Sequence, residues 1–194
     1  MIEFLSGRLI EKTPTYLVIE CHGVGYFVNI SLHTYSRIED VENCKVYTHL
    51  SIKEDAHTLF GFFEIEERKL FRDLISVSGI GTNTARMMLS SLSPAEIQQA
   101  IIQGNHVLLQ SIKGIGGKTA QRVIIDLKDK LSKKELSGQL ILPSGNKMKE
   151  EALSALLTLG FPRNAVDKTL EQIFKQSVEV KSIEEVIKLA LKNM

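Results

Sequence analysis

The stretch of this sequence with the clearest chemistry is KGIGGKTAQR, at residues 113–122. It combines glycines with cationic side chains and a threonine hydroxyl. Glycine lets the backbone come close to a ligand, and cations and N–H groups attract anions. The stretch is therefore typical of phosphate binding, and the phosphate belongs either to a nucleotide or to a nucleic acid.

The same pattern occurs 35 residues earlier in the chain. LISVSGIGTNTARMML at 74–89 aligns with LQSIKGIGGKTAQRVI at 109–124, and seven of the sixteen positions are identical. A chance pair of glycines would not recur in register. Each copy is therefore predicted to be a helix, a Gly-Ile-Gly turn and a second helix, with the isoleucine turned inward to the core.

The second helix of each copy is predicted to hold an anion. Its first N–H groups have no partner within the helix, and they lie at the positive end of the helix dipole. The glycines allow a positive φ and a close approach of the backbone. The candidate phosphate-binding residues are Gly79, Gly81, Thr82, Asn83 and Thr84 in the first copy, and Gly114, Gly116, Gly117, Lys118, Thr119 and Arg122 in the second.

A nucleotide-binding P-loop is one rival interpretation. Gly117-Lys118-Thr119 matches the end of GxxxxGK[ST], but the first glycine would have to stand where this chain has Ile112. The surrounding pattern also predicts no parallel sheet. We therefore expect no nucleotide, metal or other cofactor. A purely structural hairpin, in which the glycines only cap helices, stays open as an alternative.

Composition predicts an ordinary globular protein. The chain has 194 residues, of which 43% are hydrophobic and 24% are charged. No apolar run is long enough to span a membrane, and no signal peptide is visible, so a cytoplasmic protein is expected. Cys21 and Cys44 are isolated and are expected to be reduced. The net charge is −3 for residues 1–63, +3 for 64–135 and +1 for 136–194, so the middle third is the candidate nucleic-acid face.

The chain divides into three parts by its patterns. Short β-branched and aromatic runs at 7–11, 16–21, 26–31, 45–52 and 58–63 predict a five-stranded barrel of the OB type over residues 1–63, without a helix; an open meander is the alternative. Helical patterns at 65–76, 82–91, 94–103, 107–111 and 118–131 predict a helical domain over 64–135. A turn-rich flexible linker is expected at 136–148. Helices at 149–159, 162–174 and 182–192 predict a three-helix, UBA-like module over 149–194, which makes the fold class α+β.

Four stretches, in this order, carry a resemblance to a known family. They are MIEFLSGRLIEKTPTYLVIECHGVGYFVNIS, in which GVGY is the most recognisable mark, HLSIKEDAHTLFGFFEIEERKLFRDLISVSGIG, KGIGGKTAQRVIIDLKDKL and EEALSALLTLGF. Together they resemble the RuvA family, the Holliday-junction-binding subunits of the bacterial RuvAB branch-migration machine. Helix-hairpin-helix motifs alone are widespread, whereas the ordered combination of barrel, two hairpins and terminal module is specific.

The resemblance implies a function in DNA recombination and repair. A member would bind four-way junction DNA as a homotetramer, with one or two tetramers on a junction, and would hold the junction open. It would be no enzyme itself, and would recruit a RuvB-type AAA ATPase as the motor. The terminal module would dock on that motor, and the candidate contacts are Leu153, Leu156, Leu157, Gly160 and Phe161. From the residues alone, the three leucines and Phe161 are first of all expected to form the core of so small a module, and the division between core and contact residues stays open.

The resemblance also assigns a role to the adjacent carboxylates of Glu54 and Asp55, as an acidic pin near the junction centre. Carboxylates close to phosphates repel them and disfavour some strand paths. From the segment alone, a solvated acidic turn is the simpler interpretation. The chain departs from the family at Asn83, where many members carry a lysine, so the first hairpin lacks one charge that the second keeps at Lys118.

The competing function is that of a helix-hairpin-helix DNA glycosylase or nuclease. Such an enzyme needs a catalytic Asp or Lys beside a base pocket. Asp126 and Asp129 follow the second hairpin, but they alternate with Lys128 and Lys130 as a solvated face does. The chain has no tryptophan and 6% aromatic residues, which favours no pocket for a flipped base. A scaffold that binds no DNA would leave the repeated glycine turns unexplained.

Overall fold

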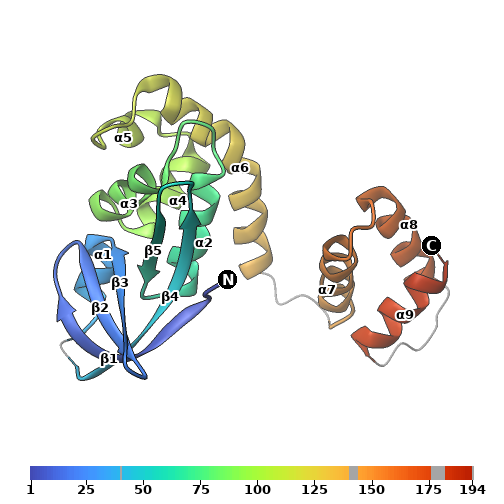
Figure 1. The fold of residues 1–194 in the computed structure, drawn as a ribbon. Helices are drawn as coiled ribbons and strands as arrows, with labels where there is room; N and C mark the ends of the chain where they lie inside the picture. The colour runs from blue at the N-terminus through green and yellow to red at the C-terminus, as the bar shows by residue number, and fades with distance from the viewer. Residues whose placement is uncertain (40, 140–143, 176–181, 194) are drawn as a thin grey trace. The chain divides into compact units, whose positions relative to one another are not determined.

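The computed structural model describes residues 1–39, 41–139, 144–175 and 182–193. The chain separates into two compact units, Met1–Lys134 and Glu135–Met194. The first unit contains both the barrel and the helical part that follows it (Figure 1). The boundary expected between them at residue 63 therefore lies inside one unit.

Strands β1 (Phe4–Lys12), β2 (Tyr16–Cys21), β3 (Val24–Ile30), β4 (Asn43–Ile52) and β5 (His57–Phe62) form a closed barrel in the order β1-β2-β3-β5-β4. Neighbouring strands are antiparallel, except that β3 and β5 run parallel. Because side chains alternate along each strand, one set fills the interior. Leu17, Ile19, Val28 and Val46 are fully buried there. The predicted barrel is confirmed, and the open meander is excluded.

One element of the barrel was not expected. Helix α1 (Leu32–Arg37) connects β3 to β4, where no helix was predicted. Its N-cap is Ser31, whose hydroxyl accepts a hydrogen bond from the N–H of Thr34 at 3.0 Å. Six residues are too few to show a helical period in the sequence, and the cap stabilises the helix locally.

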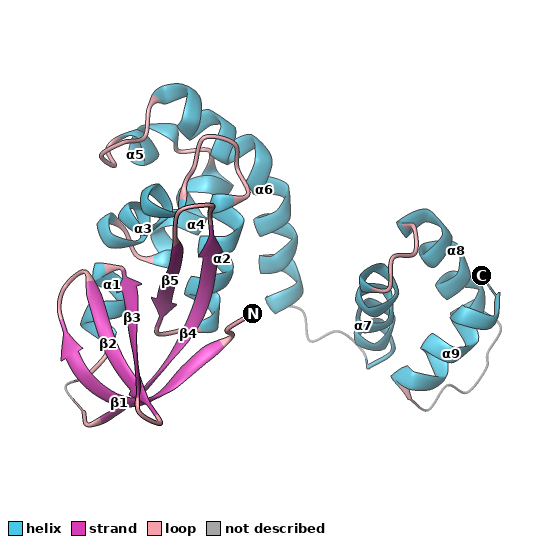
Figure 2. Cartoon of the chain, viewed as in Figure 1, coloured by secondary structure: helices cyan, strands magenta, loops and turns pink. Residues whose placement is uncertain are grey.

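The helical part consists of α2 (Ile65–Ile75), α3 (Thr82–Ser91), α4 (Pro94–Gln103), α5 (His106–Gln110) and α6 (Gly117–Gln139), shown in cyan in Figure 2. The start of α4 has a capping box between Ser93 and Glu96, and α4 ends at Gly104, whose φ is +72°. The core of the helical part includes the side chains of Leu70, Phe71, Leu74, Met88, Ile97, Ile101, Leu109 and Leu127. The predicted helices are therefore present, and their ends shift by at most one residue, except that α6 runs eight residues beyond its expected end.

Most of the segment that was predicted to be a flexible linker, residues 136–148, is helical. Helix α6 continues to Gln139, and helix α7 (Ser144–Thr158) begins within the segment. Residues 140–143 lie outside the described part of the chain. Glycine and serine lower helix propensity by a few tenths to about 1 kcal/mol per residue, which does not end a helix that is already propagating.

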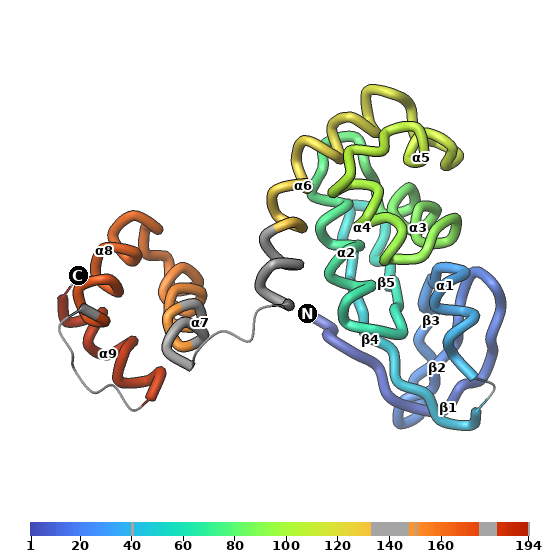
Figure 3. The backbone as a smooth tube through the Cα atoms, turned by 180° about the vertical axis from the view of Figure 1, so that it is seen from behind, coloured from blue at the N-terminus to red at the C-terminus, as the bar shows by residue number. Residues whose placement is uncertain are grey.

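The second unit contains α7, α8 (Arg163–Lys175) and α9 (Ile183–Asn193), which pack on one another (Figure 3). Its core is made by Ala152, Leu156, Val166, Leu170, Ile173, Val186 and Ala190. Each helix contributes one apolar face, as a module this small requires. The predicted three-helix module is confirmed.

The barrel and the helical part of the first unit share apolar and polar contacts. The ring of Phe71 on α2 packs against Phe60 and Phe62 on β5, with ring centroids 5.3 and 4.9 Å apart. The buried carboxylate of Glu67, also on α2, accepts hydrogen bonds from the hydroxyls of Ser31 at 2.6 Å and Thr34 at 2.7 Å. Helix α2 is thus joined both to the sheet and to α1.

Burial raises the pKa of Glu67 above its ordinary value of 4.5, although the two hydroxyls and the nearby His33 oppose the shift. A carboxyl whose pKa is raised by folding binds its proton more tightly in the folded state. Its contribution to stability is therefore present below the unfolded pKa and is lost as the pH rises through the folded pKa.

We predict that Glu67→Gln removes the loss of stability that the ionisation of Glu67 causes as the pH rises. As the pH rises from below the ordinary carboxyl pKa of 4.5 through the raised pKa of the folded state, the free energy of unfolding of the wild type should fall relative to that of Glu67→Gln, because the glutamine has no proton to release. Urea unfolding at several pH values measures this difference. Glu66→Gln, at an exposed position on the same helix, is the matched control. A difference that stays constant with pH, or grows in favour of the wild type, contradicts the prediction.

Candidate nucleic-acid interface

The first hairpin connects α2 to α3 through a tight turn. The N–H of Val77 donates to the carbonyl of Leu74 at 3.1 Å, and the N–H of Ile80 donates to that of Val77 at 3.0 Å. Gly79, between these two residues, has a left-handed conformation, with φ at +94°. The first backbone bond of α3 then runs from Ala85 N–H to Gly81 C=O at 2.9 Å.

The second hairpin repeats this geometry 35 residues later. The N–H of Ile115 donates to the carbonyl of Ile112 at 3.1 Å, and Ala120 N–H donates to Gly116 C=O at 2.9 Å. Gly114 has φ at +91°, within a few degrees of Gly79. The sequence repeat is therefore a structural repeat. Ile80 and Ile115 are 5% and 6% exposed and belong to the core, which confirms that they turn inward.

The two glycines of each turn have different roles. Only the first, Gly79 or Gly114, has a positive φ, whereas Gly81 has φ at −86° and ψ at 170° as the N-cap of α3. The freedom of glycine to adopt a positive φ is thus used at the first position of each turn and not at the second. A Cβ at Gly81 or Gly116 would meet no atom of the chain within 4 Å. These second glycines leave space in front of a helix N-terminus.

Each turn exposes the start of its second helix. The N–H groups of residues 82–84 and 117–119 precede the first intrahelical bond, and neither Gly81 nor Gly116 has a side chain to cap them. Such groups, at the positive end of a helix, form a favourable site for an anion. Among the side chains, Asn83, Lys118 and Arg122 are exposed, and Thr82, Thr84 and Thr119 are half-buried.

Arg122, a candidate phosphate-binding residue, also has a hydrogen-bond partner within the chain that the sequence did not indicate. Its Nη1 donates to the hydroxyl of Ser78 at 3.2 Å and to the Ser78 carbonyl at 3.3 Å. Ser78 lies in the turn of the first hairpin and Arg122 on the helix of the second. The contact therefore brings the two hairpins side by side, and both present glycine turns to solvent.

Helix α3 is fixed to the barrel by a polar contact that sequence reasoning missed. Arg86 Nη1 donates to Asn29 Oδ1 at 2.9 Å and to the Thr15 carbonyl at 3.3 Å. Burial lowers the pKa of Arg86 from its ordinary value. The residue lies within the aligned repeat, but only the fold brings β2, β3 and α3 together.

Glu54 and Asp55 lie at the tip of the β4–β5 hairpin. Lys53 N–H donates to the Ala56 carbonyl at 2.9 Å and closes the turn, and both carboxylates are exposed. Figures 1 and 2 show β4 and β5 running alongside α2. The acidic turn is therefore carried by the same unit as the two hairpins.

The candidate partner contacts of the terminal module differ in how far they are exposed. Leu156 is fully buried in the core, as the core interpretation of this apolar face predicts, so its side chain is not exposed to a partner in the folded module. Leu153 and Phe161 are partly buried against that core. Leu157 is 37% exposed, and Gly160 forms the exposed turn, with φ at +96°. The sequence missed Leu159, which is 61% exposed beside this turn.

The described residues hold no group of three or more side chains suited to a metal ion. Over the same part of the chain, every helix is too short or too polar to cross a membrane.

A closed barrel followed by two hairpins with open helix N-termini defines a nucleic-acid-binding protein of the helix-hairpin-helix class. Comparisons with known proteins agree with this. Residues 1–61 match the family model of the RuvA N terminal domain, residues 71–129 that of the SAM-like helix-hairpin-helix tandem, and residues 147–194 that of the RuvA C-terminal domain.

Curated relatives are similar over the whole chain. A "Holliday junction branch migration complex subunit RuvA" from Christiangramia forsetii is 56% identical, and one of the same name from Flavobacterium psychrophilum is 52% identical, each over 100% of both chains. The protein so named from Cytophaga hutchinsonii is 46% identical over 99% of both chains. This chain belongs to the RuvA family.

The different geometry of the two glycines predicts different costs of substitution. Gly114→Ala should lower the free energy of unfolding by about 1–3 kcal/mol, because alanine is strained at this positive φ. Gly116→Ala should leave stability nearly unchanged, since the added Cβ meets open space. Chemical denaturation of the two variants, and of Gly79→Ala and Gly81→Ala as the equivalent pair, measures the difference. Equal costs within a pair contradict the assignment.

Proposed function

We propose that this chain is the DNA-binding subunit of a branch-migration complex, which binds four-way junctions through backbone phosphates and catalyses no reaction itself. The observation that carries the proposal is the structural repeat of the two hairpins, each with a free helix N-terminus behind an open glycine. Family membership supports the same function, because the relatives are named as Holliday junction branch migration complex subunits.

Phosphate contacts would come mainly from the backbone. The N–H groups of residues 82–84 and 117–119 are the proposed donors, with Gly81 and Gly116 allowing the close approach. Contacts of this kind hold a duplex without reading its bases. The side chains of Thr82, Thr84, Thr119 and Lys118 would add contacts, and Arg122 would combine a phosphate contact with its bond to Ser78.

The two hairpins would contribute unequally. Lys118 is exposed at the start of α6, so its charge is available to a phosphate. The equivalent position of the first hairpin is Asn83, which is exposed but uncharged. Because charge neutralisation dominates affinity for DNA, the second hairpin would contribute the larger share.

Glu54 and Asp55 would repel the phosphates of DNA instead of binding them. Both carboxylates are exposed at the end of a hairpin, where nothing in the described structure covers them. Near a crossover they would repel phosphates, keep the arms apart and so favour a junction over a plain duplex. The acidic turn would supply specificity, and the hairpins would supply affinity.

Assembly and motor recruitment follow from the family. A homotetramer of this chain would present eight hairpins, enough to contact four duplex arms through phosphates alone. The terminal module would recruit a RuvB-type AAA ATPase in the cytoplasm, and the exposed Leu157 and Leu159 beside the Gly160 turn are the residues best placed to contact it. ATP hydrolysis would belong to that partner.

The enzymatic alternative gains no support from the structure. Asp126 and Asp129 are both exposed on α6, as a solvated face predicts. Lys130 forms an ion pair with Asp73 at 2.6 Å, which ties it to α2. Lys130 lines an open surface hollow with Lys69, Arg72 and Asp73, which is not the enclosed pocket that a base-flipping enzyme requires.

The proposal is tested by junction affinity as a function of salt. Lys118→Ala should weaken binding about equally for all DNA sequences and should reduce the slope of log affinity against log salt by about one per site. Asn83→Ala is the matched control and should change the slope little. A loss confined to one base sequence would contradict binding through the backbone.

Gly116→Val supplies the steric counterpart of this experiment. The φ of Gly116 needs no glycine, so the variant should fold normally yet lose affinity, because valine fills the space in front of the helix. Circular dichroism checks the fold. Unchanged affinity of a folded Gly116→Val variant would exclude the proposed approach of the phosphate.

The role of the acidic turn is tested with Glu54→Ala combined with Asp55→Ala. Binding to plain duplex should stay the same or increase, because two negative charges near phosphates are removed. The ratio of junction affinity to duplex affinity should fall. Gel shifts with both DNA substrates measure the ratio. A large loss of affinity for both substrates would point to a structural role for the pair.

A further inference from the structure

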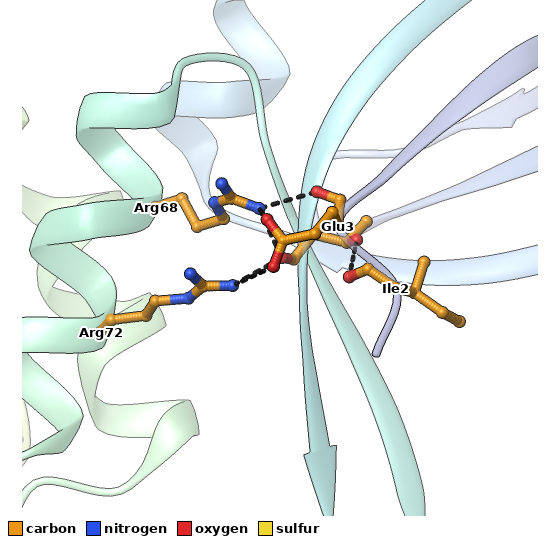
Figure 4. Close-up of polar contacts among 5 residues, drawn as sticks. Ile2, Glu3, Arg68 and Arg72 are labelled. Atoms are coloured by element: carbon orange, nitrogen blue, oxygen red, sulfur yellow. Dashed lines mark hydrogen bonds and ion pairs between the residues drawn. The ribbon is translucent and has the colours of Figure 1, made fainter. Parts of the chain in front are cut away.

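A cluster of charged residues joins the start of β1 to β4 and α2 (Figure 4). Arg68 Nη1 on α2 donates to the Glu3 carboxylate at 2.6 Å and to the Glu3 carbonyl at 2.7 Å, and it lies 3.3 Å from the Thr48 carbonyl on β4. Arg72, one turn further along α2, reaches the other Glu3 oxygen at 3.4 Å and the same Thr48 carbonyl at 3.5 Å. Two arginines thus connect one helix to two strands.

Arg68 is the buried member of this cluster, whereas Glu3 is half-exposed and Arg72 is partly exposed. The side chain of Arg68 is 10% exposed, and its guanidinium carbon lies 5.5 Å from the centre of the Tyr47 ring. The hydrogen bond from Arg68 holds the pKa of Glu3 below its ordinary value, and Arg72 adds to this effect. A buried guanidinium without its partners is costly, so these partners determine where α2 lies against the barrel.

The two elements that the cluster joins lead to the two parts of the proposed DNA site. Strand β4 runs from Thr48 to the acidic turn at Glu54, over about 20 Å at the rise of an extended strand. Helix α2 runs from Arg68 to its end at Ile75, over about 10 Å at the helical rise, and the first glycine turn follows. A rotation of about 10° at the cluster would move the acidic turn by about 3 Å relative to the first hairpin. Such a shift changes the distance between the two carboxylates and a phosphate held at that hairpin, and with it their repulsion.

We propose that Arg68, held by Glu3 and assisted by Arg72, is a positioning residue that sets the place of the acidic turn relative to the first hairpin and thereby sets the preference for junctions over duplexes. This inference rests on the proposed function. Arg68 touches no DNA in this mechanism, because it is buried and bonded within the chain. Its effect on DNA passes through β4 and α2.

The test begins with single substitutions in the full chain. Arg68→Met should lower the ratio of junction to duplex affinity by about threefold or more while the affinity for duplex itself changes less, because both hairpins are intact. Arg68→Lys should restore part of the ratio, since an ammonium group can still donate to Glu3. Glu3→Gln, at a half-exposed position that tolerates change, should give an intermediate loss and keeps the test valid if Arg68→Met does not fold.

Two controls separate positioning from charge and from stability. Lys69→Met removes the same charge from the same helix, but Lys69 is exposed and lies 3.9 Å from Glu66, outside the cluster. Ile101→Val shortens a buried side chain of the helical core and lowers stability without touching the cluster. Both variants should keep the wild-type ratio.

The decisive measurement is a double-mutant cycle with the acidic turn. In a chain that already carries Glu54→Ala and Asp55→Ala, Arg68→Met should have no further effect on the ratio, because the group that Arg68 positions is gone. Equal effects of Arg68→Met in both backgrounds would overturn the inference while leaving the proposed function intact. A wild-type chain that does not prefer junctions would overturn the proposed function itself.

Discussion

The structure depends on one constraint: the second helix of each hairpin, α3 or α6, must begin at the surface with its N–H groups uncovered. Each hairpin meets it in two steps. A positive φ at Gly79 or Gly114 reverses the chain, and an open position at Gly81 or Gly116 keeps side chains away from the helix start. The inward isoleucine between them belongs to the buried core and so holds the turn against it.

The same constraint explains why the barrel and the helical part form one unit. The proposed phosphate site consists mainly of backbone groups, which have no side-chain length to adjust, so its position would come from packing. Polar contacts join the two parts at several places, among them Glu67 with α1, Arg86 with β3, and Arg68 with Glu3. Around them, Phe71 fills the apolar space against β5. Buried polar contacts of this type specify one arrangement, because alternatives leave charges unpaired.

Much of this protein could be predicted from residue types and spacing. The alternating runs determined the barrel, and the repeat of Gly-Ile-Gly at an interval of 35 residues determined the two hairpins and the inward isoleucines. These features are local, since each follows from a strand or helix period or from the freedom of glycine. Where local signals were short or mixed, prediction failed: the six residues of α1 were missed, and α6 and α7 extended into the expected linker.

The sequence by itself thus determined which elements form and which turns expose a helix N-terminus. Only the tertiary structure decided which glycine of each pair is left-handed, that Leu156 is core while Leu159 is exposed, and that Arg68, Arg86 and Arg122 have partners within the chain. The physical reason is distance along the chain. Arg68 and Glu3 are 65 residues apart in the sequence, and the periodicity of a helix or strand cannot predict that their side chains are in contact.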